Sequence, residues 1–334
     1  MTVRVGINGF GRIGRNFFRA AKAQGVDIDF VAVNDLGDRN TMAHLLKHDS
    51  VHPNLDMEIV ATDDGISVDG DVLKVLSVRD PRELPWADLG VDVVIESTGI
   101  FTARDKAAFH LEAGAPLVIV SAPCSGADAT FVVGVNDGDF DPEVNKVISN
   151  ASCTTNCFVP MVKVLDDAFG LQKGMMTTIH AYTGDQMIVD GPHKDLRRAR
   201  AAAVNIIPTS TGAARATGLV LQSMQGRLDG SAIRVPVPDG SITDFTAVLD
   251  AEVTVEEVNA AYAAAASEGP LSAVLDYSED PLVSSDIVGS PASCTFDSGM
   301  TMAMGSMVKV AGWYDNEWGY SNRLVDLTMI TAGR

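Results

Sequence analysis

A cysteine stands where a helix is expected to begin. Cys153 follows Ser152, a residue type that favours helix N-caps, and opens the segment CTTNCFVPMVKVLDDAF, which Gly170 is expected to end. A thiol at this position feels the positive end of the helix dipole, which favours the nucleophilic thiolate. The alternative is a structural cysteine. Cys157, four residues on, is better explained as a core residue than as half of a redox pair.

A histidine at the end of an apolar predicted strand is the candidate base for this thiol. His180 lies in MMTTIHAYTGDQ, where a satisfied core histidine is the common alternative. The upstream cysteine and the downstream hydroxyl and arginine residues favour a catalytic pair, because an activated nucleophile needs an adjacent base. The other histidines lack such neighbours and are expected on helix faces or in loops: His44, His48, His52, His110 and His193.

A glycine pattern near the N-terminus predicts a dinucleotide site. Gly9, Gly11 and Gly14 fit G-x-G-x-x-G between a strand and a helix, where they allow a tight turn, close approach of a pyrophosphate and close packing. Asp35 ends the second strand, 21 residues past Gly14, where its carboxylate can accept hydrogen bonds from the adenosine ribose and repel a 2′-phosphate. The motif favours NAD over NADP. A steric glycine turn with a surface aspartate is the alternative.

The first half of the chain alternates strands and helices. Apolar and β-branched runs predict strands at 2–8, 28–35, 91–98 and 116–122, and helical spacing covers 12–24 and a stretch to about residue 47. This succession predicts an α/β fold with a doubly wound (Rossmann) NAD-binding domain over residues 1–150.

The pattern changes after Ser149. Longer alternating strands at 229–237 and 241–253 and a helix at 256–267 indicate an α+β catalytic domain over residues 151–317. Its sheet is expected to be large and mostly antiparallel. A closing helix over about 318–334 is expected to pack back on the first domain.

Composition narrows the possible partners. The chain has 334 residues and a net charge of −19, from 44 acidic and 25 basic residues, so it repels nucleic acid and anionic membranes. An anionic substrate therefore needs a local cationic pocket. Four cysteines form no disulfide framework, and no apolar run approaches the ~20 residues that span a bilayer. MTVRVGINGFGR is interpreted as a strand and turn rather than a signal peptide, so a cytoplasmic location is expected.

Longer runs extend these patterns. SNASCTTNC, HAYTGDQ, HKDLRRARAAAVNIIPTSTGAA and WYDNEWGYSNR, with GINGFGRIGR at the N-terminus, resemble the glyceraldehyde-3-phosphate dehydrogenase family over essentially the whole chain. The resemblance implies NAD-dependent, phosphorylating oxidation of glyceraldehyde 3-phosphate to 1,3-bisphosphoglycerate through a cysteine thioester. It also implies a homotetramer, in which the arginine-rich loop reaches toward a neighbour's cofactor.

The resemblance further assigns roles to individual residues. Cys153 would be the nucleophile, and His180 would keep the thiol ionised and accept the hydroxyl proton. The substrate phosphate and the attacking phosphate would be held at Ser152, Thr154, Thr183, Arg198, Thr211, Gly212 and Arg234. NAD would be held at Gly9, Gly11, Arg12, Ile13, Asp35, Arg79, Ser121 and Asn316, with Asn316 on the nicotinamide carboxamide. No metal is expected.

One departure and three rival functions are open. The residue before Pro192 is Gly191, where NAD-specific members commonly have a bulky aliphatic residue, so weak NADP use is expected. Erythrose-4-phosphate dehydrogenase shares the Cys/His pair, but its reaction ends with water instead of phosphate. A silent NAD-binding sensor or an RNA-binding protein is a further alternative. The intact Cys153 and His180 argue against the first, and the net charge of −19 argues against the second.

Overall fold

The chain forms two compact units. In the computed structural model, which describes residues 2–333, the first unit comprises the N-terminal part of the chain through Phe131, Asp137–Ala151, and the chain from Ser321 on. The second comprises Val132–Asn136 and Ser152–Tyr320. The chain therefore passes between the units directly before the helix that carries Cys153.

A nine-stranded sheet of order β3-β4-β5-β2-β1-β6-β7-β9-β8 forms the centre of the first unit. All neighbours from β5 to β8 are parallel, whereas β3 and β4 extend the sheet as an antiparallel hairpin. The strands are β1 Val3–Asn8, β2 Ile28–Asn34, β3 Ile59–Ala61, β4 Gly65–Val68, β5 Asp71–Leu76, β6 Val93–Glu96, β7 Leu117–Val120, β8 Ala129–Thr130 and β9 Val147–Ser149.

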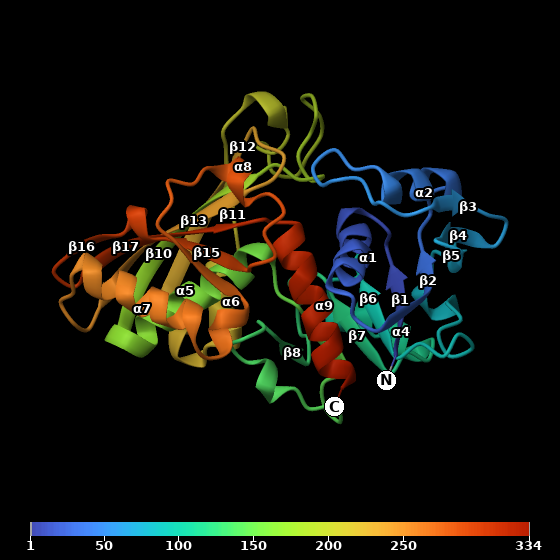
Figure 1. Ribbon diagram of the computed structural model, residues 1–334, viewed down its shortest axis with the longest axis horizontal. Coiled ribbons are helices and arrows are strands. Elements are labelled where there is room, and N and C mark those ends of the chain that lie inside the picture. Colours follow the sequence, from blue (N-terminus) through green and yellow to red (C-terminus); the bar gives the residue numbers. More distant parts are fainter. Residues whose placement is uncertain (1, 334) are drawn as a thin grey trace. The chain divides into compact units, whose positions relative to one another are not determined.

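β1 lies between β2 and β6 and is parallel to both, so the strand order reverses beside it (Figure 1). Ligands of such sheets bind outside the carboxyl ends of the strands at this reversal. The sequence expectation of a doubly wound sheet is confirmed, because the central strands are buried on both faces: Val5, Ile7, Val94 and Ile119 have no exposed surface.

The helices of this unit are α1 Arg12–Gln24, α2 Arg39–Lys47, α3 Arg104–Ala107, α4 Phe109–Glu112 and most of α9, Trp318–Ala332. α1 buries Phe17, Phe18 and Ala21 and ends at Gly25, whose φ of 65° allows the left-handed cap. Gln24 Nε2 donates to Asn322 Oδ1 at 2.8 Å, so the C-terminal helix contacts α1.

The second unit contains an eight-stranded sheet of order β11-β12-β10-β13-β17-β15-β14, with β16 paired to β17. Only β10 with β12 and β14 with β15 are parallel, so the expected mostly antiparallel sheet is confirmed. The strands are β10 Leu171–Ala181, β11 Ile207–Ser210, β12 Leu228–Val235, β13 Ser241–Leu249, β14 Leu275–Ser278, β15 Cys294–Asp297, β16 Met302–Met304 and β17 Met307–Tyr314.

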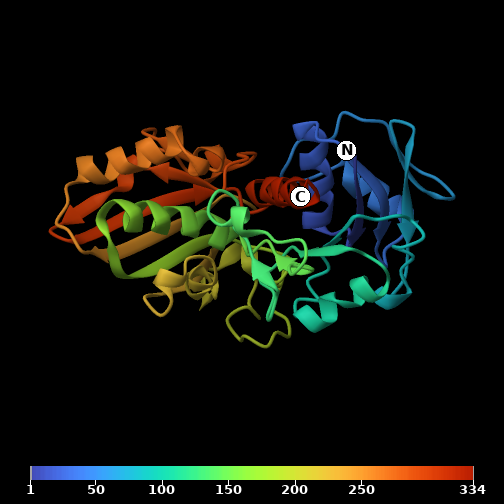
Figure 2. The ribbon, with the colours of Figure 1, turned by 90° about the horizontal axis from the view of Figure 1, so that it is seen from below.

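Helices cover one face of this sheet. They are α5 Cys153–Phe169, α6 Ala213–Val220 and α7 Val255–Ser267, with the short α8 Ser284–Ile287 beside β17. α5 (green) and α7 (orange) run over the same side of the strands in Figures 1 and 2. Phe158 of α5 meets Phe245 of β13 edge-on with ring centroids 4.7 Å apart. Met176 on the covered face is buried, whereas Met175 on the other face is 73% exposed.

Candidate active site

The three glycines of the N-terminal motif differ in what an added Cβ would meet. Gly9 has a φ of 95°, and a Cβ there would lie 2.6 Å from the backbone nitrogen of Thr98. A Cβ on Gly14 would lie 2.3 Å from the carbonyl oxygen of Gly9, so helix and turn pack without room for a methyl group. A Cβ on Gly11 would meet nothing within 4 Å. The motif therefore has two packing glycines and one that borders open space.

Asp35 is tied to this turn. Its Oδ2 accepts a hydrogen bond from Phe10 N at 2.8 Å, and its Oδ1 accepts one from Gly37 N at 2.9 Å. Gly11 is the N-cap of α1 and has no side chain to cap the start of the helix, the end at which anions are favoured. The open space at Gly11, the uncapped helix start and the half-buried carboxylate fit a dinucleotide.

The other predicted cofactor residues of this unit lie in the first turn of α1 or in the segments that follow β5 and β7. Arg12 is bound by both carboxylate oxygens of Asp49, at 3.1 Å each. Although burial opposes it, the hydrogen bonds from Arg12 and from two backbone N–H groups lower the pKa of Asp49 to about 2. Arg79 is exposed after β5, and Ile13 and Ser121 are half-buried, with Ser121 directly after β7.

A buried polar network under the turn was missed in the sequence. Asn8 Nδ2 donates to Glu96 Oε2 at 2.6 Å, and His110 Nε2 lies 3.0 Å from the same oxygen. Trp86 Nε1 donates to His110 Nδ1 at 3.0 Å, so Nδ1 is the acceptor and Nε2 carries the proton toward Glu96. His110 lies in α4, as the expectation of a helix face or loop allowed, but its full burial and its partners were not foreseen.

In the second unit, Cys153 and His180 lie together. Cys153 is the first residue of α5, and the predicted caps are confirmed: Ser152 Oγ accepts from Thr155 N at 3.1 Å, and Gly170 ends the helix. His180 is the penultimate residue of β10. Cys153 Sγ is 3.4 Å from His180 Nε2, and His180 Nδ1 lies 2.7 Å from Ala181 O. The tautomer that carries its proton on Nδ1 donates to Ala181 O and directs the lone pair of Nε2 toward the thiol.

Burial disfavours the charged form of both members of the pair. It raises the pKa of the Cys153 thiol to about 11, against the charge of Arg234 and hydrogen bonds from Thr154. Burial and the charge of Arg234 lower the pKa of His180 to about 3. The loss of hydration therefore opposes the thiolate that the helix dipole favours. Cys153 is partly exposed, whereas the other three cysteines are buried.

Arg234 stands beside the pair through strand register. It lies directly opposite His180 in the parallel pairing of β12 with β10. Its Nη1 donates to Ala181 O at 2.9 Å and also contacts His180 Nδ1. Its Nε is buried and donates to no atom of the described residues 2–333. The arrangement leaves Arg234 as a cation with unused donor capacity next to the reactive sulfur, which suits a phosphate.

Arg198 is held differently. Its Nη1 donates to Asp185 at 2.6 Å, and its Nε donates to Thr209 Oγ1 at 2.8 Å. Thr183 is two residues before Asp185, and Thr183 N donates to Gln186 Oε1 at 2.8 Å. An anion at Arg198 must therefore compete with the carboxylate of Asp185.

Two further predicted substrate residues lie at the start of α6. Thr211 Oγ1 accepts from Ala213 N at 3.2 Å. Gly212 is the N-cap of α6 and gives no side-chain hydrogen bond, so the helix start leaves backbone donors open. A Cβ on Gly212 would meet nothing within 4 Å.

Tyr314 was not predicted from the sequence. Its hydroxyl contacts Thr154 Oγ1 at 2.9 Å and Thr178 Oγ1 at 2.7 Å, and its ring packs edge-on against His180 with centroids 5.8 Å apart. Burial raises its pKa far above the usual range, so the phenol stays neutral. Thr154 is itself buried, and its hydrogen bonds run to Tyr314 and Cys153. Tyr314 thus supports the Cys153–His180 pair, through its ring contact with His180 and its hydrogen bond with Thr154.

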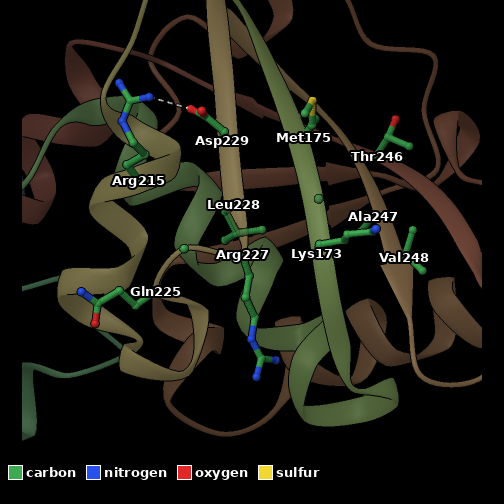
Figure 3. Close-up of a pocket in the computed structure, with 12 residues that line it drawn as sticks. Lys173, Met175, Arg215, Gln225, Arg227, Leu228, Asp229, Thr246, Ala247 and Val248 are labelled. Carbon is green, nitrogen blue, oxygen red and sulfur yellow. Dashed lines mark hydrogen bonds and ion pairs between the residues drawn. The ribbon is translucent and has the colours of Figure 1, made fainter.

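A cavity of about 920 Å³ lies elsewhere on this unit. It is lined by Lys173 and Met175 of β10 and by residues of β12, β13 and α6, on the side of the sheet that helices leave open (Figure 3). Within this lining, Arg215 Nη1 forms an ion pair with Asp229 Oδ1 at 2.9 Å. Neither Cys153 nor His180 lines it, so this cavity is not the catalytic site.

Comparisons with known proteins agree with this geometry. Residues 3–104 match the family model of the glyceraldehyde 3-phosphate dehydrogenase NAD binding domain, and residues 152–316 match that of the C-terminal domain of the same family. The chain is 62% identical to glyceraldehyde-3-phosphate dehydrogenase of Streptomyces coelicolor over 335 aligned residues, with all of both chains covered. It is 59% identical to the enzyme of Mycobacterium avium, with 99% of each chain covered. No helix within residues 2–333 has the length and apolar character to cross a bilayer.

Proposed function

Because the chain belongs to the glyceraldehyde-3-phosphate dehydrogenase family, we propose that Cys153 and His180 are its catalytic pair and that Arg198 and Arg234 bind its anionic substrates. The enzyme is an NAD-dependent oxidoreductase that converts glyceraldehyde 3-phosphate and phosphate to 1,3-bisphosphoglycerate. The relatives carry this name and support the activity over that of an erythrose-4-phosphate dehydrogenase.

His180 acts first as a base. Its Nε2 takes the proton of the Cys153 thiol, and Sγ adds to the aldehyde carbon of the substrate. The imidazolium returns this proton to the new oxygen, which gives a thiohemiacetal. NAD, when bound, supplies the two-electron oxidant that the thiohemiacetal needs to become a thioester, and Nε2 accepts the hydroxyl proton in that step. Phosphate then attacks the thioester carbon, the C–S bond breaks, and Cys153 leaves as thiolate.

The two anion sites differ in whether their arginine is already paired with a carboxylate. Arg234 offers buried donors beside Cys153, so we assign it to the phosphate nearest the reacting carbon. Arg198 is already paired with Asp185, so binding there exchanges one anion for another. Thr183, Thr211 and the open helix start at Gly212 complete this group, and Ser152 and Thr154 flank the sulfur.

NAD is assigned to the glycine turn and its neighbours. Gly9 and Gly11, with Arg12 and Ile13 at the start of α1, would hold the pyrophosphate, and Asp35 the adenosine ribose. Arg79 and Ser121 are assigned to the rest of the cofactor, and Asn316 to the nicotinamide carboxamide. Residues 1–150 would thus serve as the NAD-binding domain and residues 151–317 as the catalytic domain.

The contact that carries the catalytic assignment is the 3.4 Å approach of Cys153 Sγ to His180 Nε2, with Nδ1 held on Ala181 O. The test is NADH formation from glyceraldehyde 3-phosphate, with and without inorganic phosphate. His180→Asn should retain NAD binding and lose roughly 10²–10⁴ in kcat, the usual contribution of general acid–base catalysis. Cys153→Ser should form no thioester, whereas Cys124→Ser, the control, should keep wild-type activity.

Two outcomes would overturn these assignments. Near wild-type kcat in His180→Asn would return His180 to the role of a core histidine. Turnover that does not depend on phosphate would favour the erythrose-4-phosphate dehydrogenase type of reaction.

We also propose a cytoplasmic homotetramer. The loop 182–206 exposes large apolar side chains, including Ile188 at 90% and Leu196 at 81%, which a monomer would leave in water. The open face of the second sheet, with Met175 and the cavity of Figure 3, is a second surface that assembly would cover. These features support self-association.

A further inference from the structure

We propose that Ser241 is a positioning residue that fixes the amide of Asn316 so that its nitrogen faces the cofactor. This inference rests on the proposed role of Asn316 in binding the nicotinamide carboxamide. Ser241 Oγ donates to Asn316 Oδ1 at 2.7 Å and accepts from Ala181 N at 3.0 Å. Ser241 and Ala181 have no exposed surface, and Asn316 is 5% exposed.

The direction of these hydrogen bonds follows from donor count. Ala181 N–H can only donate, so Ser241 Oγ accepts from it and keeps its single proton for another acceptor. That acceptor is Asn316 Oδ1, which leaves the two N–H bonds of Nδ2 for a ligand. A reversed amide would leave the buried hydroxyl proton of Ser241 without this acceptor, at the cost of an unmade buried hydrogen bond.

Sheet topology explains how Ser241 can reach both Ala181 and Asn316. Ser241 is the first residue of β13, which lies between β10 and β17 in the sheet. β10 carries His180 near its end, and Ser241 is paired with Tyr314 at the end of β17, two residues before Asn316. One hydroxyl on the middle strand therefore reaches both neighbouring strand ends.

Ala181 joins this serine to the catalytic pair. Its carbonyl oxygen accepts from His180 Nδ1 and from Arg234 Nη1, while its N–H donates to Ser241. A single peptide segment thus orients the base, the anion-binding arginine and, through Ser241, the amide of Asn316. The geometry ties the position of the nicotinamide anchor to that of the catalytic base.

The test compares the binding of NAD with that of ADP-ribose, which lacks the nicotinamide. In Ser241→Ala, calorimetry should give a Kd for NAD raised about three- to tenfold, the range for one lost hydrogen bond, and an unchanged Kd for ADP-ribose. Ser241→Thr keeps the hydroxyl and should restore the NAD affinity. Thr243→Val is the matched control, because Thr243 is equally buried on the same strand and its Oγ1 has no partner among residues 2–333.

A double-mutant cycle separates this inference from the role of Asn316. Asn316→Ala should itself weaken NAD relative to ADP-ribose, and adding Ser241→Ala should then cost nothing further. If Asn316→Ala leaves the ratio of the two affinities unchanged, the proposed role of Asn316 is wrong. If Asn316→Ala weakens NAD relative to ADP-ribose but Ser241→Ala does not, the positioning role of Ser241 is overturned. The same holds if Ser241→Ala weakens both ligands equally.

Discussion

At the scale of single residues, burial and catalysis make opposite demands on Cys153 and His180. The surroundings that exclude water from the pair also raise the pKa of the thiol to about 11 and lower that of the imidazole to about 3. A raised thiol pKa lowers the fraction of thiolate, which is the nucleophilic form. In the proposed mechanism, proton transfer over the 3.4 Å contact is therefore part of the reaction.

This predicts an alkylation profile for the free enzyme. Iodoacetamide should modify Cys153 first and abolish activity, because Cys124, Cys157 and Cys294 are buried. The second-order rate should keep rising as pH increases from about 9 toward 11, since the fraction of thiolate grows throughout this range. Peptide mapping identifies the site, and Cys153→Ser is the blank. A rate that is already maximal below pH 8 would show that the resting pair is ionic.

We expect the choice of cofactor to depend on one residue. In the proposed site Asp35 presents a carboxylate to the ribose, and it accepts the hydrogen bond from Phe10 N at 2.8 Å, so it combines a charge and a loop contact. Asp35→Asn removes only the charge, whereas Asp35→Gly removes both. NADP should gain in kcat/KM in both variants, because the repulsion between two anions is gone. NAD should lose more in Asp35→Gly than in Asp35→Asn. Equal efficiency of the wild type with NAD and NADP would contradict this view of Asp35.

At the scale of elements, helices with a strong local sequence pattern could be predicted from the sequence. The predicted helices at 12–24 and 318–332 match α1 and α9, and Ser152 and Gly170 correctly bounded α5. The hairpin β3–β4 and the strand β5 were missed, because these strands are only three to six residues long and carry no long apolar run. Similarly, nothing local indicated the strands β14 to β16, which are three or four residues long.

The site was harder to predict than the elements that hold it. Cys153 and His180 could be suspected singly, but their contact needs α5 and β10 to meet. Arg234 lies beside His180 only through the register of β12 on β10, and register over a long connection is not encoded in local pattern. The buried partners Tyr314, Glu96 and His110 look like ordinary core or loop residues in the sequence. These assignments required the structure or the family resemblance.

The glycine turn gives a prediction at this scale. Gly14→Ala would put a Cβ 2.3 Å from the backbone oxygen of Gly9, so β1 and α1 must separate, and the free energy of unfolding should fall by about 1–3 kcal/mol. Gly11→Ala meets no protein atom and should keep its stability while weakening NAD and ADP-ribose alike, because its methyl group occupies the pyrophosphate approach. Denaturant melts and calorimetry test this contrast. Equal stability of the two variants would contradict the packing role of Gly14.

At the scale of the whole molecule, the −19 charge and the anionic substrates conflict. The proposed anion sites would resolve the conflict locally, since Arg234 lies beside Cys153 with a buried donor unused while Arg198 is balanced by Asp185. A net charge of this size also keeps molecules apart in solution. Any assembly must therefore rest on surfaces that are apolar rather than charged.

The loop 182–206 offers exposed apolar side chains among its charged residues. It lies between β10 and β11, contains little regular structure, and exposes Ile188, Leu196 and Ile206. Side chains of this kind seldom cluster in water without a partner, and a family with closed symmetry would use the same loop on every subunit. The same loop carries Arg198 and Asp185, so we expect its conformation to affect the proposed anion site as well as assembly.

We therefore expect a native mass of four times 35.3 kDa, measured by light scattering on a sizing column. Leu196→Asp and Ile188→Asp place a charge in the apolar loop and should shift the enzyme to smaller species, because a buried unpaired charge at an interface is costly. Val144→Asp, at a similarly exposed apolar residue outside the loop, should leave the mass unchanged. The smaller species should also show a raised KM for phosphate, since the loop that holds Arg198 loses its support. A wild-type mass of one subunit, or a tetramer that tolerates both charges, would rule out this loop as the assembly surface.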